Sequence, residues 1–385
     1  LRRLRGRHSV RILTLIAACC ATSVLAFHQD GVTTAPAEAI YVSTVSPERA
    51  DTDVAEQTAE LLTRVDESLR RRGSAVGEAV HAQITVADPG DIAAVDRAFA
   101  ARYKGIDPPA RTVLVGVPAH GARLAMQVVA VRTGTPRRAI RPSGWADAPA
   151  QSHAILAGDT LYLSGMVAKD PRTDVPVPGD VPAQVRAIMD NAGVLLRAAG
   201  MAYDNVASGR VWVRDMSTFA AMNEAYRGYW ELDRPTRATI QASLPPFDVG
   251  ITLVAVAGRR EVVVPANADG TPGTIGPNFS PAIRVGRRLF VSGNTGGTPS
   301  NRGDVAGQSH EALAKIGRAL TAGGFTFEDV VFAETWLTDV TRLPAVNQVY
   351  TPLFAGATPP AHSIVGIPSL AGRTALVEIA VLASK

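Results

Sequence analysis

Three short apolar stretches of the chain, each ending at a serine, have the length and composition of β-strands. They span residues 39–43, 160–164 and 289–292. After each of these stretches, apolar residues recur at helical spacing, as in the series Val181, Val185, Ile188, Met189, Ala192, Leu195 and Leu196. Asp180 before this series and Gly200 after it are typical helix start and stop signals. The pattern therefore predicts a strand followed by an amphipathic helix, three times over.

The stretches that follow complete a common order of elements. They comprise β-rich segments at residues 206–213 and 330–337, segments of helical spacing at 218–230 and 343–354, and closing strands such as 238–243 and 251–257. The order is strands, helix, strand, helix, strands. It predicts an α+β domain in which two helices pack on one face of a mixed sheet.

Four landmarks recur in the same register in three copies. The first is the sequence Asp-Val-x-x-Gln, and the other three are counted from its glutamine. A glycine follows after 16 residues, and an Asp or Asn follows after 39 residues, with an aromatic residue three positions later. A proline-flanked Arg or His follows after 53 or 54 residues. In order, these residues are Gln57, Gly73, Asp96, Phe99 and Arg111; Gln184, Gly200, Asn223, Tyr226 and Arg237; and Gln308, Gly324, Asn347, Tyr350 and His362. A fixed period of this kind is the signature of tandem units.

Linkers rich in Gly and Pro lie between the copies, at residues 134–136 and 266–273. We therefore predict three units, at residues 36–134, 138–262 and 274–385. The first copy is shorter at its front, which suggests that it lacks the opening hairpin of the other two.

The first 26 residues predict a secretory signal peptide. A stretch with five arginines and no acid is followed by an apolar segment at residues 12–26, which at about 15 residues is shorter than the ~20 that span a bilayer. Two kinds of processing fit: cleavage after Val24-Leu25-Ala26, or lipidation of Cys19 in Ile16-Ala17-Ala18-Cys19, which would anchor the protein to a membrane. Both alternatives stay open, and both predict a periplasmic or secreted protein.

Charge and cysteine usage exclude several classes of function. Residues 27–385 hold 34 basic and 35 acidic side chains, a net charge of −1. They contain no basic cluster of the kind that nucleic-acid binding requires. Both cysteines, Cys19 and Cys20, lie inside the segment, so the rest of the chain offers no thiol for a disulfide, a nucleophile or a zinc ligand. The seven histidines show no paired metal-ligand spacing. We expect no nucleic-acid partner, no metal and no cofactor.

The three copies resemble the RidA/YjgF family of enamine/imine deaminases. The third copy matches the family pattern most clearly, in Gly276-Pro277-Asn278-Phe279-Ser280-Pro281-Ala282, Val291-Ser292-Gly293, Gly303-Asp304-Val305, Asn347-Gln348-Val349-Tyr350 and Leu376-Val377-Glu378-Ile379. The second copy matches in Leu163-Ser164-Gly165, Asp170-Pro171, Gly179-Asp180-Val181, Asn223, Tyr226 and the stretch from Arg237 to Pro245. The resemblance implies a chorismate-mutase-like α+β fold that usually forms homotrimers with ligand clefts between subunits.

This implied assembly leads to two alternatives for the whole chain. The three units close one intramolecular pseudo-trimer, or they are separate modules on a string. Short linkers and sheet faces that would otherwise be exposed favour the closed ring.

The resemblance also implies roles for individual residues. The arginine that binds the substrate carboxylate corresponds to Arg111 and Arg237, where the third copy has His362. The glutamate that positions the hydrolytic water corresponds to Glu378, with Thr252 expected at its place in copy two and Ala125 or Gln127 in copy one. Ser164, Ser292, Asn223 and Phe279 would complete the substrate pocket, with Gln151 at the position of Phe279 in copy two. No copy keeps the full set, so Glu378 would have to complement an arginine of a neighbouring copy.

Two functions are therefore expected from the sequence. The first is an exported RidA-like hydrolase that converts small enamines or imines, such as 2-imino acids, to a carbonyl compound and ammonia. The alternative is a non-catalytic periplasmic protein that binds small carboxylates or serves as a scaffold. The ribonuclease role sometimes attached to the family is disfavoured by the charge of −1.

Overall fold

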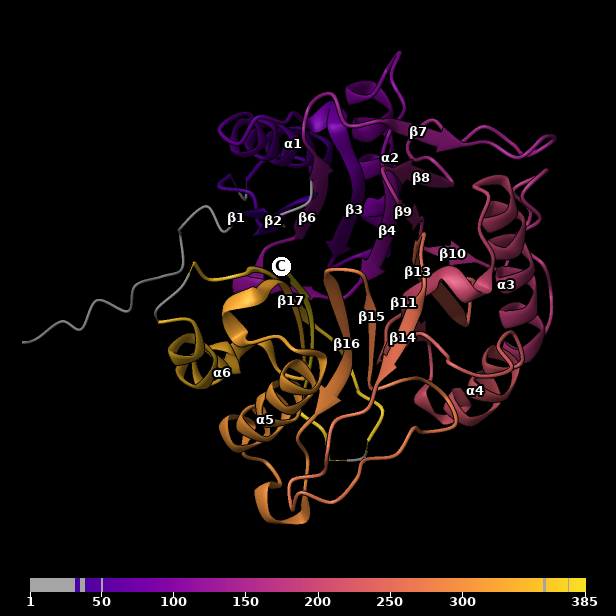
Figure 1. The fold of residues 1–385 in the computed structure, drawn as a ribbon. Helices are drawn as coiled ribbons and strands as arrows, with labels where there is room; N and C mark the ends of the chain where they lie inside the picture. The colour runs from indigo at the N-terminus through magenta and orange to yellow at the C-terminus, as the bar shows by residue number, and fades with distance from the viewer. Residues whose placement is uncertain (1–31, 35–38, 50, 356–357, 373) are drawn as a thin grey trace, which may run out of the picture.

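The structure is a computed structural model that describes residues 32–34, 39–49, 51–355, 358–372 and 374–385 (Figure 1). The expected signal peptide at residues 1–26, with Cys19 and Cys20, lies outside the described residues, so its processing stays a prediction. Among the helices that are described, none is long and apolar enough to cross a membrane.

The described chain consists of three units, each built on one sheet (Figure 1). Unit 1 contains β1 (Val32–Thr34), β2 (Ala39–Val45), α1 (Val54–Arg70), β3 (Ala79–Val86), α2 (Ile92–Arg102), β4 (Ala110–Val115), β5 (Val117–Pro118) and β6 (Leu124–Val131). Unit 2 contains β7 (Arg137–Ile140), β8 (Ala154–Ala157), β9 (Thr160–Leu163), β10 (Met166–Val167), α3 (Val181–Ala198), β11 (Val206–Val213), α4 (Phe219–Arg227), β12 (Thr236–Gln241) and β13 (Val249–Val256). Unit 3 contains β14 (Arg260–Val263), β15 (Ala282–Val285), β16 (Arg288–Thr295), α5 (Val305–Gly323), β17 (Val330–Leu337), α6 (Leu343–Tyr350), β18 (Ala361–Gly366) and β19 (Val377–Ser384). Because β14 pairs with β15, residues 260–262 belong to the sheet of unit 3 and not, as expected, to unit 2.

The three sheets share one strand order, except that in the described residues the sheet of unit 1 has no strand equivalent to β7 or β14. It is β1-β2-β6-β3-β4 in unit 1, β7-β8-β9-β13-β11-β12 in unit 2 and β14-β15-β16-β19-β17-β18 in unit 3. The last strand of each unit lies in the middle of its sheet, antiparallel to both neighbours. The two strands on either side of the second helix run parallel, as a helical crossover requires. These ladders define which residues of the three units are equivalent.

The repeated Asp-Val-x-x-Gln sequence begins the long helix of each unit. Asp53, Asp180 and Asp304 are N-caps whose carboxylates accept hydrogen bonds from backbone N–H groups of the first turn. Gln184 and Gln308 are buried and hydrogen-bond to the loop before β13 or β19. The motif therefore fixes the start of the helix and ties it to the start of the unit's last strand.

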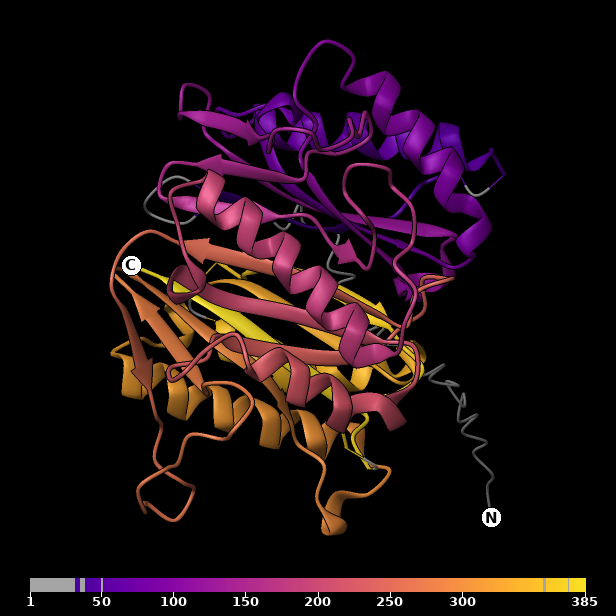
Figure 2. The same ribbon diagram turned by 90° about the vertical axis from the view of Figure 1, so that its right-hand side faces the viewer.

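The three units close into a ring. The helices lie on the outside, and the other faces of the sheets meet at the centre (Figures 1 and 2). Two hydrophobic clusters there include residues of all three units, among them Tyr41, Tyr162 and Phe290 in one cluster and Leu114, Trp212 and Trp336 in the other. β18 of unit 3 pairs with β5 of unit 1, which joins the last unit to the first.

The predicted fold class is confirmed: the chain has three α+β units with mixed sheets, two helices on one face of each sheet, and a closed ring. The expected lack of an opening hairpin in the first copy is wrong. β1 pairs antiparallel with β2, with Thr33 opposite Tyr41. The hairpin escaped notice because β1 has only three residues.

Candidate functional site

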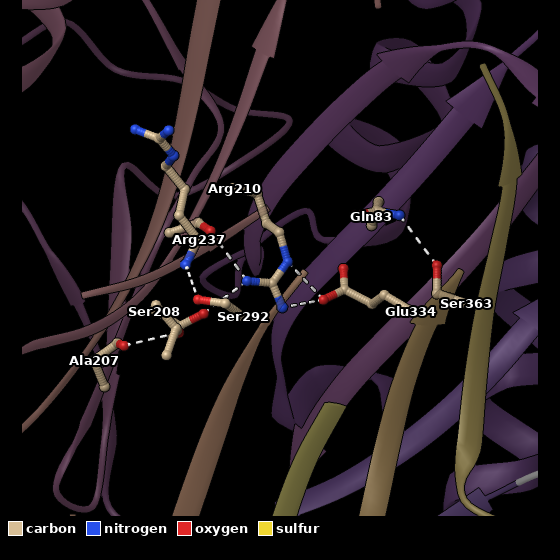
Figure 3. Close-up of polar contacts among 10 residues, drawn as sticks. Gln83, Ala207, Ser208, Arg210, Arg237, Ser292, Glu334 and Ser363 are labelled. Atoms are coloured by element: carbon tan, nitrogen blue, oxygen red, sulfur yellow. Dashed lines mark hydrogen bonds and ion pairs between the residues drawn. The ribbon is translucent and has the colours of Figure 1, made fainter. Parts of the chain in front are cut away.

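One contact between neighbouring units is repeated three times around the ring. The backbone N–H of Arg111 donates to Ser164 Oγ at 2.8 Å, that of Arg237 to Ser292 Oγ at 2.9 Å, and that of His362 to Ser43 Oγ at 3.0 Å. We call the three places interface 1/2, interface 2/3 and interface 3/1 after the units that meet there. Figure 3 shows the contact at interface 2/3.

The two predicted serines hold the chain in place at these interfaces. Ser164 Oγ also donates to the carbonyl of Ser152, and Ser292 Oγ to that of Ser280. Each hydroxyl thus joins its strand region to the segment before β8 or β15 of its own unit and to the backbone of the neighbouring unit. Contact of Ser164 or Ser292 with a substrate stays a prediction.

Arg237 lies at interface 2/3 with its guanidinium largely without hydrogen-bond partners. The residue is 2% exposed, and burial lowers the pKa of the guanidinium. Its Nη2 donates to Asn223 Oδ1, whereas Nε and Nη1 have no hydrogen-bond partner in the described part of the chain. Aromatic rings surround it, with centroids at 5.1 Å for Tyr226, 5.4 Å for Phe279 and 5.8 Å for Phe219. A buried guanidinium with free donors is suited to bind an anion.

Glu378 reaches the same interface from unit 3. A Cβ placed on Gly293 would lie 1.8 Å from Glu378 Oε1 and 2.9 Å from the Cβ of Ala238, the residue after Arg237. The carboxyl therefore lies directly over a glycine and beside β12 of unit 2. Its Oε2 has no hydrogen-bond partner among the described residues, and its charge interacts with that of Arg237. Arg237 and Glu378, predicted from separate copies, are thus placed at the same interface, close enough for their charges to interact.

Burial raises the pKa of Glu378 to about 8. The backbone N–H of Thr239 and the charges of Arg210 and Arg237 lower it, and the charge of Glu334 raises it, but the loss of hydration dominates. The carboxyl is therefore mostly protonated at neutral pH and exchanges its proton near physiological pH, as a general acid and base must.

This pKa has a consequence for stability. An acid whose pKa is higher in the folded state than in the unfolded state binds more protons when folded, so it makes the fold less stable as pH rises between the two values. The Glu378→Gln variant lacks this titration, and its Tm relative to the wild type is expected to be higher at about pH 9 than at about pH 5. Thermal unfolding at both pH values checks this. An equal Tm difference at both would contradict the raised pKa.

The residues expected at the place of Glu378 in the other copies need correction. On the ladders, Glu378 lies opposite Trp336, Gly250 opposite Trp212, and Ala125 opposite Thr85. The counterpart in copy two is therefore Gly250 and not Thr252. In copy one it is Ala125, one of the two expected alternatives, and not Gln127.

Trp212 fills the place of the missing carboxyl at interface 1/2. A Cβ on Gly250 would lie 2.1 Å from the indole of Trp212, and one on Gly165, the equivalent of Gly293, would lie 3.0 Å from it. Beside this ring, Thr252 Oγ1 and Thr112 Oγ1 of unit 1 are 2.8 Å apart in a hydrogen bond. Interface 1/2 therefore has an indole where interface 2/3 has an acid.

Arg111 differs from Arg237 in its charge balance. It is 5% exposed, and its Nη2 forms an ion pair with Asp96, the equivalent of Asn223. Its Nε and Nη1 have no hydrogen-bond partner in the described chain. A surface pocket of about 390 Å³ opens between units 1 and 2 and contains Gln151, but Arg111 is not among the residues that line it. The guanidinium charge at interface 1/2 is already neutralised by the protein.

Interface 3/1 holds no cationic side chain at the equivalent position. His362 Nε2 lies 2.8 Å from Thr335 Oγ1, and the ring stacks on Tyr350 with centroids 4.6 Å apart. Burial lowers the pKa of His362 to about 4, so the imidazole is neutral at physiological pH. With Ala125 in place of the glutamate, this interface has neither charge.

The remaining predicted residues also lie at interface 2/3. Phe279 and Asn223 both contact the Arg237 guanidinium, from the segment before β15 and from α4. Sequence reasoning missed Trp212. Its signal was available, because a tryptophan recurs at the equivalent position of β17, Trp336. Among the described residues, no group of three or more His, Cys, Asp or Glu side chains could hold a metal ion.

Comparison with known proteins identifies a family model that matches two of the three units. A family model described as endoribonuclease L-PSP matches residues 146–258 and 271–385. A RutC family protein of Pyrococcus horikoshii is 38% identical over 109 residues, which cover 28% of this chain and 86% of that protein. The 2-iminobutanoate/2-iminopropanoate deaminase of Rattus norvegicus is 34% identical over 108 residues, covering 28% of this chain and 79% of the rat protein.

A solved structure matches nearly the whole length. A chorismatase crystal structure aligns with a TM-score of 0.54 over 92% of this chain and 99% of its own chain, at 16% sequence identity, and so shows the fold alone. Unit 1 lies outside both matches of the family model, yet it has the strand order of units 2 and 3. Since those two matches cover more than half of the chain, the protein belongs to the endoribonuclease L-PSP family, which is the RidA/YjgF family that its sequence resembles.

Proposed function

We propose that this protein hydrolyses small 2-imino acids, or the enamines from which they form, to 2-keto acids and ammonia at interface 2/3. The observation that supports this most strongly is the meeting of two groups from different units. Arg237 has free donors and no anionic hydrogen-bond partner in the described chain, and Glu378 is a carboxyl whose pKa is about 8. One binds a carboxylate, and the other moves protons.

The reaction needs one anion site and one proton carrier. The Arg237 guanidinium binds the substrate carboxylate and so places the C=N carbon near Glu378. Protonated Glu378 gives its proton to the imine nitrogen, which makes the carbon more electrophilic. Water then adds to the carbon, and the Glu378 carboxylate takes a proton from it. The same carboxyl moves the hydroxyl proton of this adduct to the amine, the C–N bond breaks, and ammonia leaves as the ketone forms.

The other two interfaces have no role in this proposal. At interface 1/2 the arginine is paired with Asp96 and Trp212 fills the place of the acid. At interface 3/1 the imidazole of His362 is neutral. The proposal therefore assigns one working site to each chain. It retains the extracytoplasmic location expected from residues 1–26.

The direct test uses 2-imino acids generated in solution by an amino-acid oxidase, with 2-keto acid and ammonia release followed against a buffer control. We expect faster release with the protein than without it. No acceleration would contradict the proposal. Binding of 2-keto acids without hydrolysis would then favour the alternative, a non-catalytic protein that binds small carboxylates.

Gly293 offers a second variant whose effect follows from geometry. Its backbone φ does not require glycine, but an alanine Cβ would lie 1.8 Å from Glu378 Oε1, so the carboxyl must move away. We expect Gly293→Ala to lower kcat for imine hydrolysis by about 100-fold, since a displacement of about 1 Å has effects of that size. Gly276→Ala is the matched control, because its Cβ would meet nothing within 4 Å. Equal kcat values for the two variants would show that the position of Glu378 is unimportant.

A further inference from the structure

An ion pair at the centre of the ring lies between units 2 and 3. Arg210 Nε donates to Glu334 Oε2 at 2.6 Å, and Nη2 contacts the same oxygen. Arg210 Nη1 also donates to Ser208 Oγ at 2.7 Å and to the carbonyl of Gly209 at 3.1 Å. Figure 3 shows this cluster beside the backbone of Arg237 and Ser292. The guanidinium is thus held in one place by four contacts.

The three units differ at this position. Arg210 of unit 2, Glu334 of unit 3 and Gln83 of unit 1 are equivalent on the ladders, one residue after Gly209, Ala333 and Ala82. Gln83 donates to Ser363 Oγ at 3.2 Å, away from the ion pair. In a ring of three identical subunits, the same residue would occur at this position in every subunit. In this ring the one arginine and the one glutamate are directed to interface 2/3, where Glu378 lies.

Two structural links lead from this pair to Glu378. The Arg210 guanidinium carbon lies 5.8 Å from the ring centroid of Trp336, and Trp336 is the cross-strand partner of Glu378. Arg210, Trp336 and Ala238 also line one cavity of about 10 Å³, and Ala238 Cβ lies beside the position of the Glu378 carboxyl. Such a cavity holds about one water at most, so bulk water does not screen the charges across it.

We propose that Arg210, held by Glu334, is a positioning residue for Glu378: its charge and its contact with Trp336 set the orientation and the proton affinity of the carboxyl that moves protons in the reaction. This inference rests on the proposed function. The charged groups that act on Glu378 are Arg210 from β11, Arg237 from β12 and Glu334 from β17. Of these, only Arg237 is assigned a contact with the substrate in the proposed function, so the charges of Arg210 and Glu334 can be changed without removing that contact.

The two members of the pair have opposite effects on the Glu378 proton. Arg210 lowers the pKa of Glu378 and Glu334 raises it. Arg210→Met is therefore expected to raise that pKa, and Glu334→Gln to lower it. Both variants break the same ion pair. If the ion pair only stabilised the fold, the pKa of Glu378 would shift in the same direction in both variants.

The test titrates Glu378 directly and does not depend on turnover. The full chain is labelled with ¹³C at the glutamate carboxyls, Glu378→Gln assigns the resonance, and its midpoint is measured in the wild type, Arg210→Met, Glu334→Gln and Gln83→Met. We expect opposite shifts in the first two variants and none in Gln83→Met, the third position of the same ring. Shifts in the same direction, or none, would overturn the inference, and thermal unfolding establishes that each variant is folded.

The pH dependence of imine hydrolysis then separates the inference from the proposed function. If the wild type hydrolyses imines, the midpoint of kcat against pH should move with the NMR midpoint in each variant. If the midpoint of kcat against pH stays the same in a variant in which the NMR midpoint of Glu378 shifts, Arg210 has no role in the reaction. A wild type that does not accelerate hydrolysis at all would refute the proposed function whatever the titration shows.

Discussion

Replacing Glu378 with glutamine is expected to lower kcat for 2-imino acid hydrolysis by about 10²- to 10⁴-fold, the range that general acid–base catalysis supplies. Glutamine has the same shape and keeps the contacts over Gly293, but it cannot give up and regain a proton. KM should change little, because in the proposed mechanism Arg237 rather than Glu378 binds the substrate carboxylate. Steady-state kinetics of the two purified proteins measure both constants.

Two controls make this result specific. The Tm of Glu378→Gln should equal or exceed that of the wild type above about pH 8, since the variant buries no titrating acid. Glu56→Gln makes the same side-chain exchange at an exposed position in the first turn of α1, and its kcat should equal that of the wild type. If Glu378→Gln kept more than about one tenth of wild-type kcat, general acid–base catalysis by this residue would be refuted.

The second large effect is expected at Arg237. Arg237→Met should lower kcat/KM by about 30- to 5,000-fold, because loss of one partner of a buried charged contact costs about 2–5 kcal/mol. Arg111→Met is the matched comparison at the equivalent position of interface 1/2, and its kcat/KM should stay within about twofold of wild type. Kinetics of the two variants at one pH test this directly.

The contrast between the two arginines distinguishes one working site from two. If each interface worked, Arg111→Met and Arg237→Met would each remove part of the activity. If Arg111→Met alone abolished turnover, the site would lie at interface 1/2, and the assignment to interface 2/3 would be wrong. Thermal unfolding of both variants controls for loss of the fold, since both arginines are buried.

The fold was predictable because its signals are local. The Asp-Val-x-x-Gln sequence places an N-cap and a buried glutamine at the start of each long helix, and in units 2 and 3 this glutamine hydrogen-bonds to the loop before the last strand. The strand-to-helix order then follows from hydrophobic spacing alone. The ring followed from the family resemblance together with the need to cover the other face of each sheet.

The composition of each interface was not predictable, because it depends on which units meet. The sequence places Arg237 and Glu378 in different copies. It does not show which of the two arginines, Arg111 or Arg237, shares an interface with Glu378. The ladders also corrected the counterpart of Glu378 in copy two. The loop between β12 and β13 is three residues shorter than the loop between β18 and β19, so the spacing between arginine and glutamate positions differs between copies, and the register has Gly250 where Thr252 was expected.

The residues at the centre of the ring escaped sequence reasoning for another reason. β11 and β17 are buried along nearly their whole length, so Arg210 and Glu334 stand in mostly apolar runs without the alternation that marks a face. The available signal was that equivalent positions of copies two and three hold side chains of opposite charge, Arg210 and Glu334. This signal indicates an ion pair only once units 2 and 3 are known to face one another.

The central claim, that one of the three interfaces is a working site, is tested most directly by counting bound ligands. Titration calorimetry with 2-oxobutanoate, a small 2-keto acid of the product class, should give one site per chain. That site should be lost in Arg237→Met and kept in Arg111→Met. Two or three equivalent sites, or one site that survives the loss of Arg237, would contradict the account.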